Sequence, residues 1–143
     1  METLLKELQT MFLAEKMIIT GSVALAKYGL FTDKVGDVDI LLLKPAKETI
    51  ELIERMSKDF PVKRKPSTNK TFIGSFTKND MKIEVFLADK EEFLTIDGLN
   101  YAKIAGIVKA KQSYKRAKDF IQLRKISRMF FKEEEFVSWL NTR

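Results

Sequence analysis

The chain has 143 residues, of which 45% are hydrophobic and 32% charged, a composition typical of one folded domain and not of a disordered chain. It contains no cysteine and no histidine, which excludes disulfides, sulfur or imidazole metal sites and the usual serine triad. A bound metal must therefore have oxygen ligands, which favours magnesium, manganese or calcium. The N-terminal segment is too acidic for a signal peptide and the apolar runs are too short to span a bilayer, so we expect a cytoplasmic protein without membrane contact.

The net charge is +6, from 26 lysines and arginines against 20 acidic residues. The excess is concentrated in residues 109–132, where Asp119 is the sole acidic residue. Such a stretch can attract a polyanion through counterion release, or it can be a solvated face that keeps the protein soluble. Charge alone favours the solvated face.

Helices and strands alternate in the first half of the chain. The hydrophobic spacing predicts, in order, a helix at 3–14, a strand at 17–19, a helix at 23–28, a strand at 37–43 and a helix from 45 to about 58. Ser22 is placed to cap the second helix and Gly29 to end it, whereas Pro45 favours the first turn of the third.

The second half begins with strands and ends with helices. We expect an edge strand at 62–65, strands at 70–77 and 81–88, and helices at about 101–113, 117–129 and 132–140. Asn79 and Asp80 favour a tight turn, so the two longer strands should form a hairpin. This order predicts an α+β fold with a small mixed sheet flanked by helices: one domain, 1–143, with a core at about 17–90 and a helical C-terminal part at about 97–143.

Two aspartates begin the strand predicted at 37–43. Successive side chains of a strand alternate between faces, so Asp37 and Asp39 point to the same side. Two carboxylates at a buried strand end repel each other and lose hydration, and a divalent cation would neutralise them. The alternative is a pair of solvent-exposed aspartates at a strand start, with Lys34 as ion-pair partner.

Glu84 offers a third carboxylate. Within the strand predicted at 81–88 it shares one face with Lys82 and Phe86. If sheet pairing brings Glu84 beside Asp37 and Asp39, three carboxylates converge, as two-metal phosphoryl or nucleotidyl transfer requires. The alternative is an outward-facing charge paired with Lys82.

Gly21 and Ser22 lie between a predicted strand and a predicted helix. Glycine lets a phosphate approach the backbone, the start of a helix offers free N–H groups, and the Ser22 hydroxyl can donate a hydrogen bond to a phosphate. The pair alone is a weak signal, because any helix can begin with serine. Its value is its position one short helix before the two aspartates.

Lys111 extends an apolar stripe at helical spacing that is formed by Ile104, Ile107 and Val108. Arg116 and Asp119 share one face of the following helix. These charges either form an ion pair between the two helices or clamp the phosphates of a nucleotide, with Asp119 holding Lys111 in place. The two interpretations are compatible.

These motifs, in this order, resemble the nucleotidyltransferase superfamily related to DNA polymerase beta. The matching segments are residues 19–29 (ITGSVALAKYG), 36–42 (GDVDILL) and 83–86 (IEVF). The chain looks most like small bacterial and phage-borne members that resemble the abortive-infection toxins of toxin–antitoxin pairs. In that branch a lysine, an arginine and an aspartate follow in a helical pair, as Lys111, Arg116 and Asp119 do here, so that the resemblance covers about residues 17–124.

The resemblance implies transfer of a nucleoside monophosphate from an NTP, such as ATP, to an acceptor hydroxyl with Mg²⁺ or Mn²⁺. It makes Asp37, Asp39 and Glu84 the metal ligands and catalytic residues, with Glu84 as the general base. The implied nucleotide-binding residues are Gly21, Ser22, Lys111, Arg116 and Asp119. The basic helices suggest RNA, such as a tRNA end, as the acceptor, and the toxin-like branch implies an antitoxin partner protein.

The chain departs from that branch at two places. No arginine precedes the aspartates in residues 32–36, where Lys34 is the substitute, and Gln122 stands where the branch often carries another aspartate. Two other functions stay open: a catalytically inactive binding module of the same fold, and a basic RNA-binding protein. The second is disfavoured because the three tyrosines and the one tryptophan form no stacking cluster beside the lysines.

Overall fold

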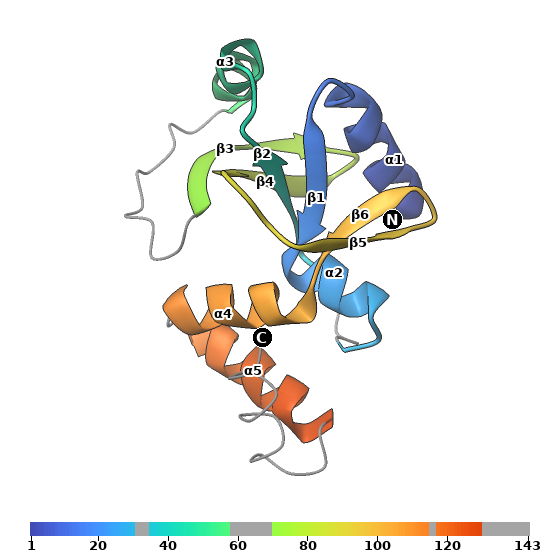
Figure 1. Ribbon diagram of the computed structural model, residues 1–143, viewed down its shortest axis with the longest axis vertical. Coiled ribbons are helices and arrows are strands. Elements are labelled where there is room, and N and C mark those ends of the chain that lie inside the picture. The colour runs from blue at the N-terminus through green and yellow to red at the C-terminus, as the bar shows by residue number, and fades with distance from the viewer. Residues whose placement is uncertain (31–34, 58–69, 115–116, 130–143) are drawn as a thin grey trace.

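A computed structural model describes residues 1–30, 35–57, 70–114 and 117–129, which form five helices and a six-stranded mixed sheet (Figure 1). The helices are α1 (Glu2–Met11), α2 (Gly21–Lys27), α3 (Lys47–Met56), α4 (Ile104–Tyr114) and α5 (Ala117–Met129). The strands are β1 (Lys16–Thr20), β2 (Asp37–Leu43), β3 (Lys70–Lys78), β4 (Met81–Ala88), β5 (Phe93–Ile96) and β6 (Leu99–Ala102). The predicted α+β fold is confirmed.

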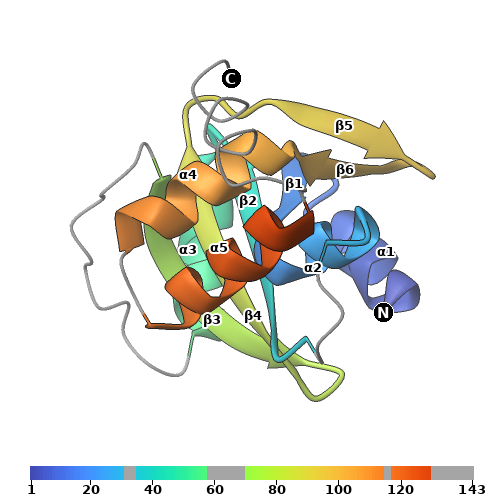
Figure 2. The same cartoon turned by 90° about the horizontal axis from the view of Figure 1, so that it is seen from below.

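The strands follow the order β3-β4-β2-β1-β6-β5 across the sheet. The central strand β2 pairs antiparallel with β1 and parallel with β4, and β1 pairs parallel with β6. Helices α1 and α3 lie on one face of this sheet, and α2, α4 and α5 lie on the other, as Figures 1 and 2 show. Each face of β2 is therefore covered, which explains its nearly continuous apolar sequence after Asp39.

Helix α3 approaches β3 closely at Gly74. A Cβ atom at this position would collide with Ser57 Oγ and would lie 3.1 Å from Ile53 Cγ2. The register of β3 against β4 shifts between Phe72 and Gly74, a β-bulge at the same place. A glycine at the bulge therefore lets the buried side chain of Ile53 reach the sheet.

Two strands at residues 93–102 were not predicted, and the predicted start of the next helix at about residue 101 was wrong. These residues form the hairpin β5–β6, and the following helix begins at Ile104 rather than at about residue 101. The turn residues Asp97 and Gly98 have φ angles of 52° and 81°, and two left-handed residues make the tight turn that suits a hairpin. Tyr101 pairs with Ile19 of β1 and is buried, so sheet pairing overrides the helical spacing that continues from residue 104.

The predicted helix cap at Ser22 was also wrong. Helix α2 begins at Gly21, its N-cap residue is Thr20, and no side chain caps it. Gly21 has a φ of 64°, so the chain turns from strand to helix one residue earlier than the serine. The edge strand predicted at 62–65 and the helix predicted at 132–140 lie outside the described residues. Among the residues that are described, no helix combines the length and apolar character of a membrane span.

The left-handed turn at Gly98 yields a test of the β5–β6 hairpin. Neither Gly98 nor Gly36 has an atom within 4 Å of where a Cβ would lie, but only Gly98 has a positive φ. Gly98→Ala should therefore lower the free energy of unfolding by about 1–2 kcal/mol, the cost of a left-handed alanine. The control, Gly36→Ala, should change it by less than about 0.5 kcal/mol. Denaturant unfolding measures both, and equal effects would contradict the assigned turn.

Candidate functional site

Helices α2, α4 and α5 cover one face of the sheet (Figure 2), and three carboxylates belong to that face, because Asp39 Oδ2 lies against Gly21 of α2. The parallel register of β2 and β4 sets Asp39 opposite Glu84 and Asp37 opposite Lys82. Directly paired residues of neighbouring strands point to the same side, so Asp37, Asp39 and Glu84 share that face. Glu84 also lies 3.3 Å from the Lys82 ammonium, so it has both a carboxylate neighbour and the cationic partner considered above.

Asp39 has an unusual electrostatic environment. Its pKa is raised to about 7, chiefly by burial and then by the charge of Glu84, a hydrogen bond with Glu84 and the charge of Asp37, whereas Lys111 opposes the shift. Near neutral pH, Asp39 therefore retains a proton more readily than an exposed aspartate. Its oxygen Oδ1 is buried and has no hydrogen-bond partner within the described ranges.

Gly21 makes room for the Asp39 carboxylate. A Cβ atom at Gly21 would collide with Asp39 Oδ2, and the left-handed φ of 64° would strain any other residue. The β1–β2 register places Thr20 opposite Asp39, so the turn from β1 into α2 passes directly over the carboxylate. The glycine that the sequence suggested for phosphate approach thus also has a steric role toward Asp39.

A buried polar network joins α4 and α5 to the start of α2. The Lys111 ammonium lies 3.9 Å from Asp119 Oδ1, and both residues are buried. Lys111 also donates a hydrogen bond to Gln122 Oε1, and Gln122 Nε2 donates to Ser22 Oγ at 3.1 Å. The ion pair between the helices is therefore present, and it is continuous with the predicted phosphate-binding serine. Arg116 lies outside the described residues.

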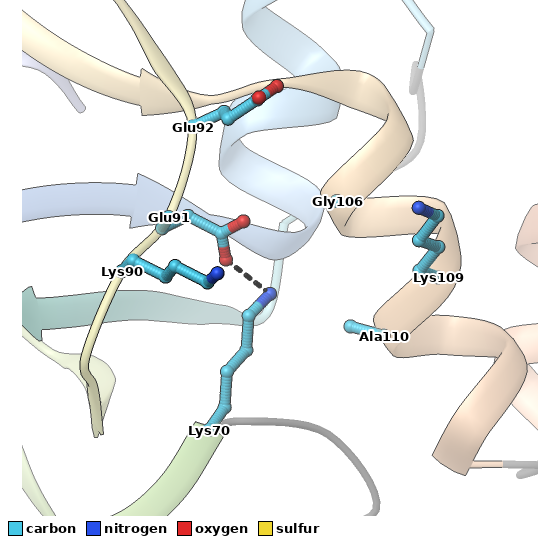
Figure 3. A pocket seen from close by; sticks show the side chains of 7 residues that line it. All are labelled: Lys70, Lys90, Glu91, Glu92, Gly106, Lys109 and Ala110. Carbon is cyan, nitrogen blue, oxygen red and sulfur yellow. Dashed lines mark ion pairs between the residues drawn. The ribbon is translucent and has the colours of Figure 1, made fainter. Parts of the chain in front are cut away.

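The Lys70 side chain lines two spaces, and one of them is also lined by Asp39. A narrow space of about 40 Å³ is lined by Gly21, Asp39, Lys70 and Lys111, among others. A larger cavity of about 510 Å³ also has Lys70 in its wall, together with Glu91 and with Lys109 of α4 (Figure 3). The Lys70 and Glu91 side chains form an ion pair of 2.7 Å and are only 10% and 11% exposed.

Sequence reasoning did not find Lys70 or Glu91. Lys70 is the first residue of β3, and Glu91 follows β4 in the connection to β5. The two are 21 positions apart in the sequence, and Glu91 stands among other charged residues, so only the fold brings them together. The Glu91 carboxylate packs closely against α4 at a glycine: a Cβ at Gly106 would lie 2.7 Å from Glu91 Oε1.

The donor atoms on this face suit a hard divalent cation. In the part of the chain that is described, no three acidic side chains are already arranged as a metal-binding cluster. The unpartnered Asp39 Oδ1 and the raised pKa of Asp39 nevertheless indicate that the negative charge of this carboxylate is incompletely balanced. Carboxylate oxygens are the ligands that Mg²⁺ and Mn²⁺ prefer, so the residues fit such an ion in their chemistry.

The chain was compared with known proteins by sequence and by structure. No family model and no curated protein matches the sequence. Among solved structures, the chain is similar to TM1012 of Thermotoga maritima, provisionally described as a nucleotidyltransferase, with 20% identity, a TM-score of 0.43 and coverage of 90% of this chain and 84% of the other. A Helicobacter pylori protein with the same provisional description has 18% identity, a TM-score of 0.47 and coverage of 78% and 60%.

A third solved structure, JHP933 of Helicobacter pylori, has 19% identity and a TM-score of 0.39, and the match covers 66% of this chain and 47% of the other. The chain therefore spans less than two thirds of both Helicobacter proteins. Similarity at this level concerns the path of the chain and does not extend to its chemistry.

The raised pKa of Asp39 predicts how stability depends on pH. Between its ordinary value of 3.8 and about 7, the folded protein keeps a proton that the unfolded chain has released. Without divalent metal, the free energy of unfolding should therefore fall as the pH rises through this range. Asp39→Asn, which stays neutral, should exceed the wild type in stability at pH 8 by on the order of 2–4 kcal/mol, and by much less at pH 4.

Thermal melts at the two pH values measure this difference. Asp80→Asn is the matched control, because Asp80 is exposed in the β3–β4 turn and its positive φ suits asparagine. A stability difference for Asp39→Asn that is the same at pH 4 and pH 8 would show that folding does not raise the pKa of Asp39.

Proposed function

We propose that this chain is a metal-dependent nucleotidyltransferase that moves a nucleoside monophosphate from an NTP to an acceptor hydroxyl. The observation that carries the proposal is the in-register pairing of Asp39 with Glu84, with Asp37 on the same face and Asp39 Oδ1 unpartnered among the described residues. The sequence resemblance independently selects the same three carboxylates. Buried Lys111 beside them supplies a cation for phosphate.

The residues of the site have separate roles in the proposed reaction. Mg²⁺ or Mn²⁺ held by Asp37, Asp39 and Glu84 would neutralise phosphate charge. Lys111 and the Ser22 hydroxyl bind and orient the phosphates. The acceptor oxygen forms a bond to the α-phosphorus, the bond to pyrophosphate breaks, and Glu84 takes the proton of the acceptor hydroxyl.

The cavity of about 510 Å³, which shares Lys70 and Ala110 with the narrow space beside Asp39, has room for parts of the substrates beyond the reacting phosphate. Its walls include Lys70, Lys90 and Lys109, and α4 and α5 carry further basic residues. These charges favour a polyanionic acceptor, and we take RNA, such as a tRNA end, as the acceptor class. The toxin-like branch adds a protein antitoxin as a proposed partner.

Metal binding has a readout that needs no substrate. Millimolar Mg²⁺ or Mn²⁺ should raise the melting temperature of the wild type by several degrees at pH 8, because the ion binds the folded state and replaces the missing positive charge. Asp39→Asn should lose most of this shift, whereas Asp80→Asn should keep it. Equal shifts in the wild type and in Asp39→Asn would place the ion elsewhere.

Activity is tested with each labelled NTP and total RNA in the presence of Mg²⁺ or Mn²⁺. The wild type should transfer label to RNA. Asp39→Ala should reduce the transfer at least about a hundredfold, because it removes a ligand of the metal ion that would neutralise the reacting phosphate. Asp89→Ala is the matched control, since Asp89 is exposed just after β4, and its activity should equal that of the wild type.

Calorimetry with the same NTPs separates the outcomes when no label is transferred. Binding of an NTP without transfer to RNA, to protein or to the enzyme itself would indicate the inactive binding module. Loss of both transfer and NTP binding, with RNA still bound, would indicate the basic RNA-binding protein.

A further inference from the structure

We infer that Gln122 is a positioning residue, which orients the Ser22 hydroxyl so that its proton points toward a bound phosphate. The inference rests on the proposed function, because it concerns the nucleotide that this function requires. It goes beyond that function in assigning a role to a position where the resembling branch often has an acid and this chain has an amide. The carrying observation is the chain of hydrogen bonds from Lys111 through Gln122 to Ser22.

The direction of every bond in this chain follows from the chemistry of its members. A lysine ammonium has donors only, so the Gln122 atom that faces Lys111 must be the amide oxygen. The amide nitrogen of Gln122 then faces Ser22, and an amide NH₂ group only donates. Ser22 Oγ is therefore the acceptor, and its own hydrogen must point in another direction.

Within the described residues, no side chain or carbonyl accepts that hydrogen. Ser22 is the second residue of α2, so the carbonyl four residues earlier belongs to β1 and not to a preceding helical turn. Among the described residues, the bond from Gln122 is the sole side-chain hydrogen bond of Ser22. The neighbouring Gly21 lines the narrow space shared with Asp39 and Lys111, where a phosphate would lie. A phosphate oxygen there is the acceptor that completes the chain.

A carboxylate at position 122 would reverse this arrangement. It accepts hydrogen bonds and does not donate them, so it would take one from Lys111 and another from the Ser22 hydroxyl. The serine proton would then point at residue 122 and away from the nucleotide. An amide is the side chain that accepts from the lysine and donates to the serine at once.

The test is a double-mutant cycle on nucleotide binding. Calorimetry with each NTP and Mg²⁺ gives the Kd of the wild type, Ser22→Ala, Gln122→Glu and the double variant. Ser22→Ala should weaken binding about tenfold or more in the wild type, where it removes a hydrogen bond to a charged group. In the Gln122→Glu background it should weaken binding less than about twofold, since the proton is already diverted. The cycle cancels the general effect of the added negative charge.

Gln122→Met is the matched control for packing, because it has a similar length and no hydrogen-bonding amide. Without the donating amide the serine hydroxyl is no longer oriented, so Ser22→Ala should weaken binding less than in the wild type but more than in the Gln122→Glu background. Gln122→Asp, with the same charge on a shorter side chain, replaces Gln122→Glu if thermal melts show that the latter does not fold.

Two results would overturn the inference alone: the same loss on Ser22→Ala in the Gln122→Glu background as in the wild type, or the same loss in the Gln122→Met background as in the wild type. Either result leaves the proposed function standing, because the wild type still binds the nucleotide. Absence of NTP binding by the folded wild type would overturn the inference together with the proposed function.

Discussion

The parallel pairing of β2 with β4 is the constraint on which the candidate site depends. Its register sets Asp39 opposite Glu84 on one face and Ile40 opposite Val85 on the other, where both are fully buried. A slip by one residue would turn a carboxylate toward the apolar face against α1 and α3 and expose apolar side chains to the polar face. Burial of the hydrophobic residues therefore holds together two carboxylates that repel each other.

The opposing charge comes from a different layer of the molecule. Lys111 belongs to α4, and its charge partly offsets the burial and repulsion that raise the pKa of Asp39. Its own burial is compensated by Asp119 on α5, so the two helices cover the sheet without leaving a buried ammonium unpaired. The carboxylates of the sheet and the cation of the helices are thus parts of one electrostatic arrangement.

Alternation along single strands was sufficient to predict that Asp37 and Asp39 share a face and that Glu84 stands with Lys82 and Phe86. The register between the two strands could not be predicted, because a helix and a hairpin arm separate them in the sequence and neither fixes their alignment. The β5–β6 hairpin was missed for a related reason. Its short strands have weak alternation, and the helical spacing after residue 104 extends backward across Tyr101, which only pairing with β1 assigns to the sheet.

Residues whose roles depend on distant partners left the weakest signal in the sequence. Lys70 and Glu91 look like ordinary surface charges, yet the fold nearly buries them against each other at the wall between two cavities. Gln122 was visible only as a departure from a pattern, and the loss of an acid suggests at first a weaker site.

The contacts of Gln122 give that departure a different meaning. Lys111 already has a carboxylate partner in Asp119, so a second acid at position 122 is not needed to balance the ammonium. What the position requires instead is a group that accepts from the lysine and donates to the serine, and glutamine does both. An amide in place of an acid at position 122 reverses the direction of the hydrogen bond to Ser22, while the ion pair of Lys111 with Asp119 stays intact. The Ser22 hydroxyl can then donate to a phosphate, and the Lys111 charge that attracts the phosphate is kept.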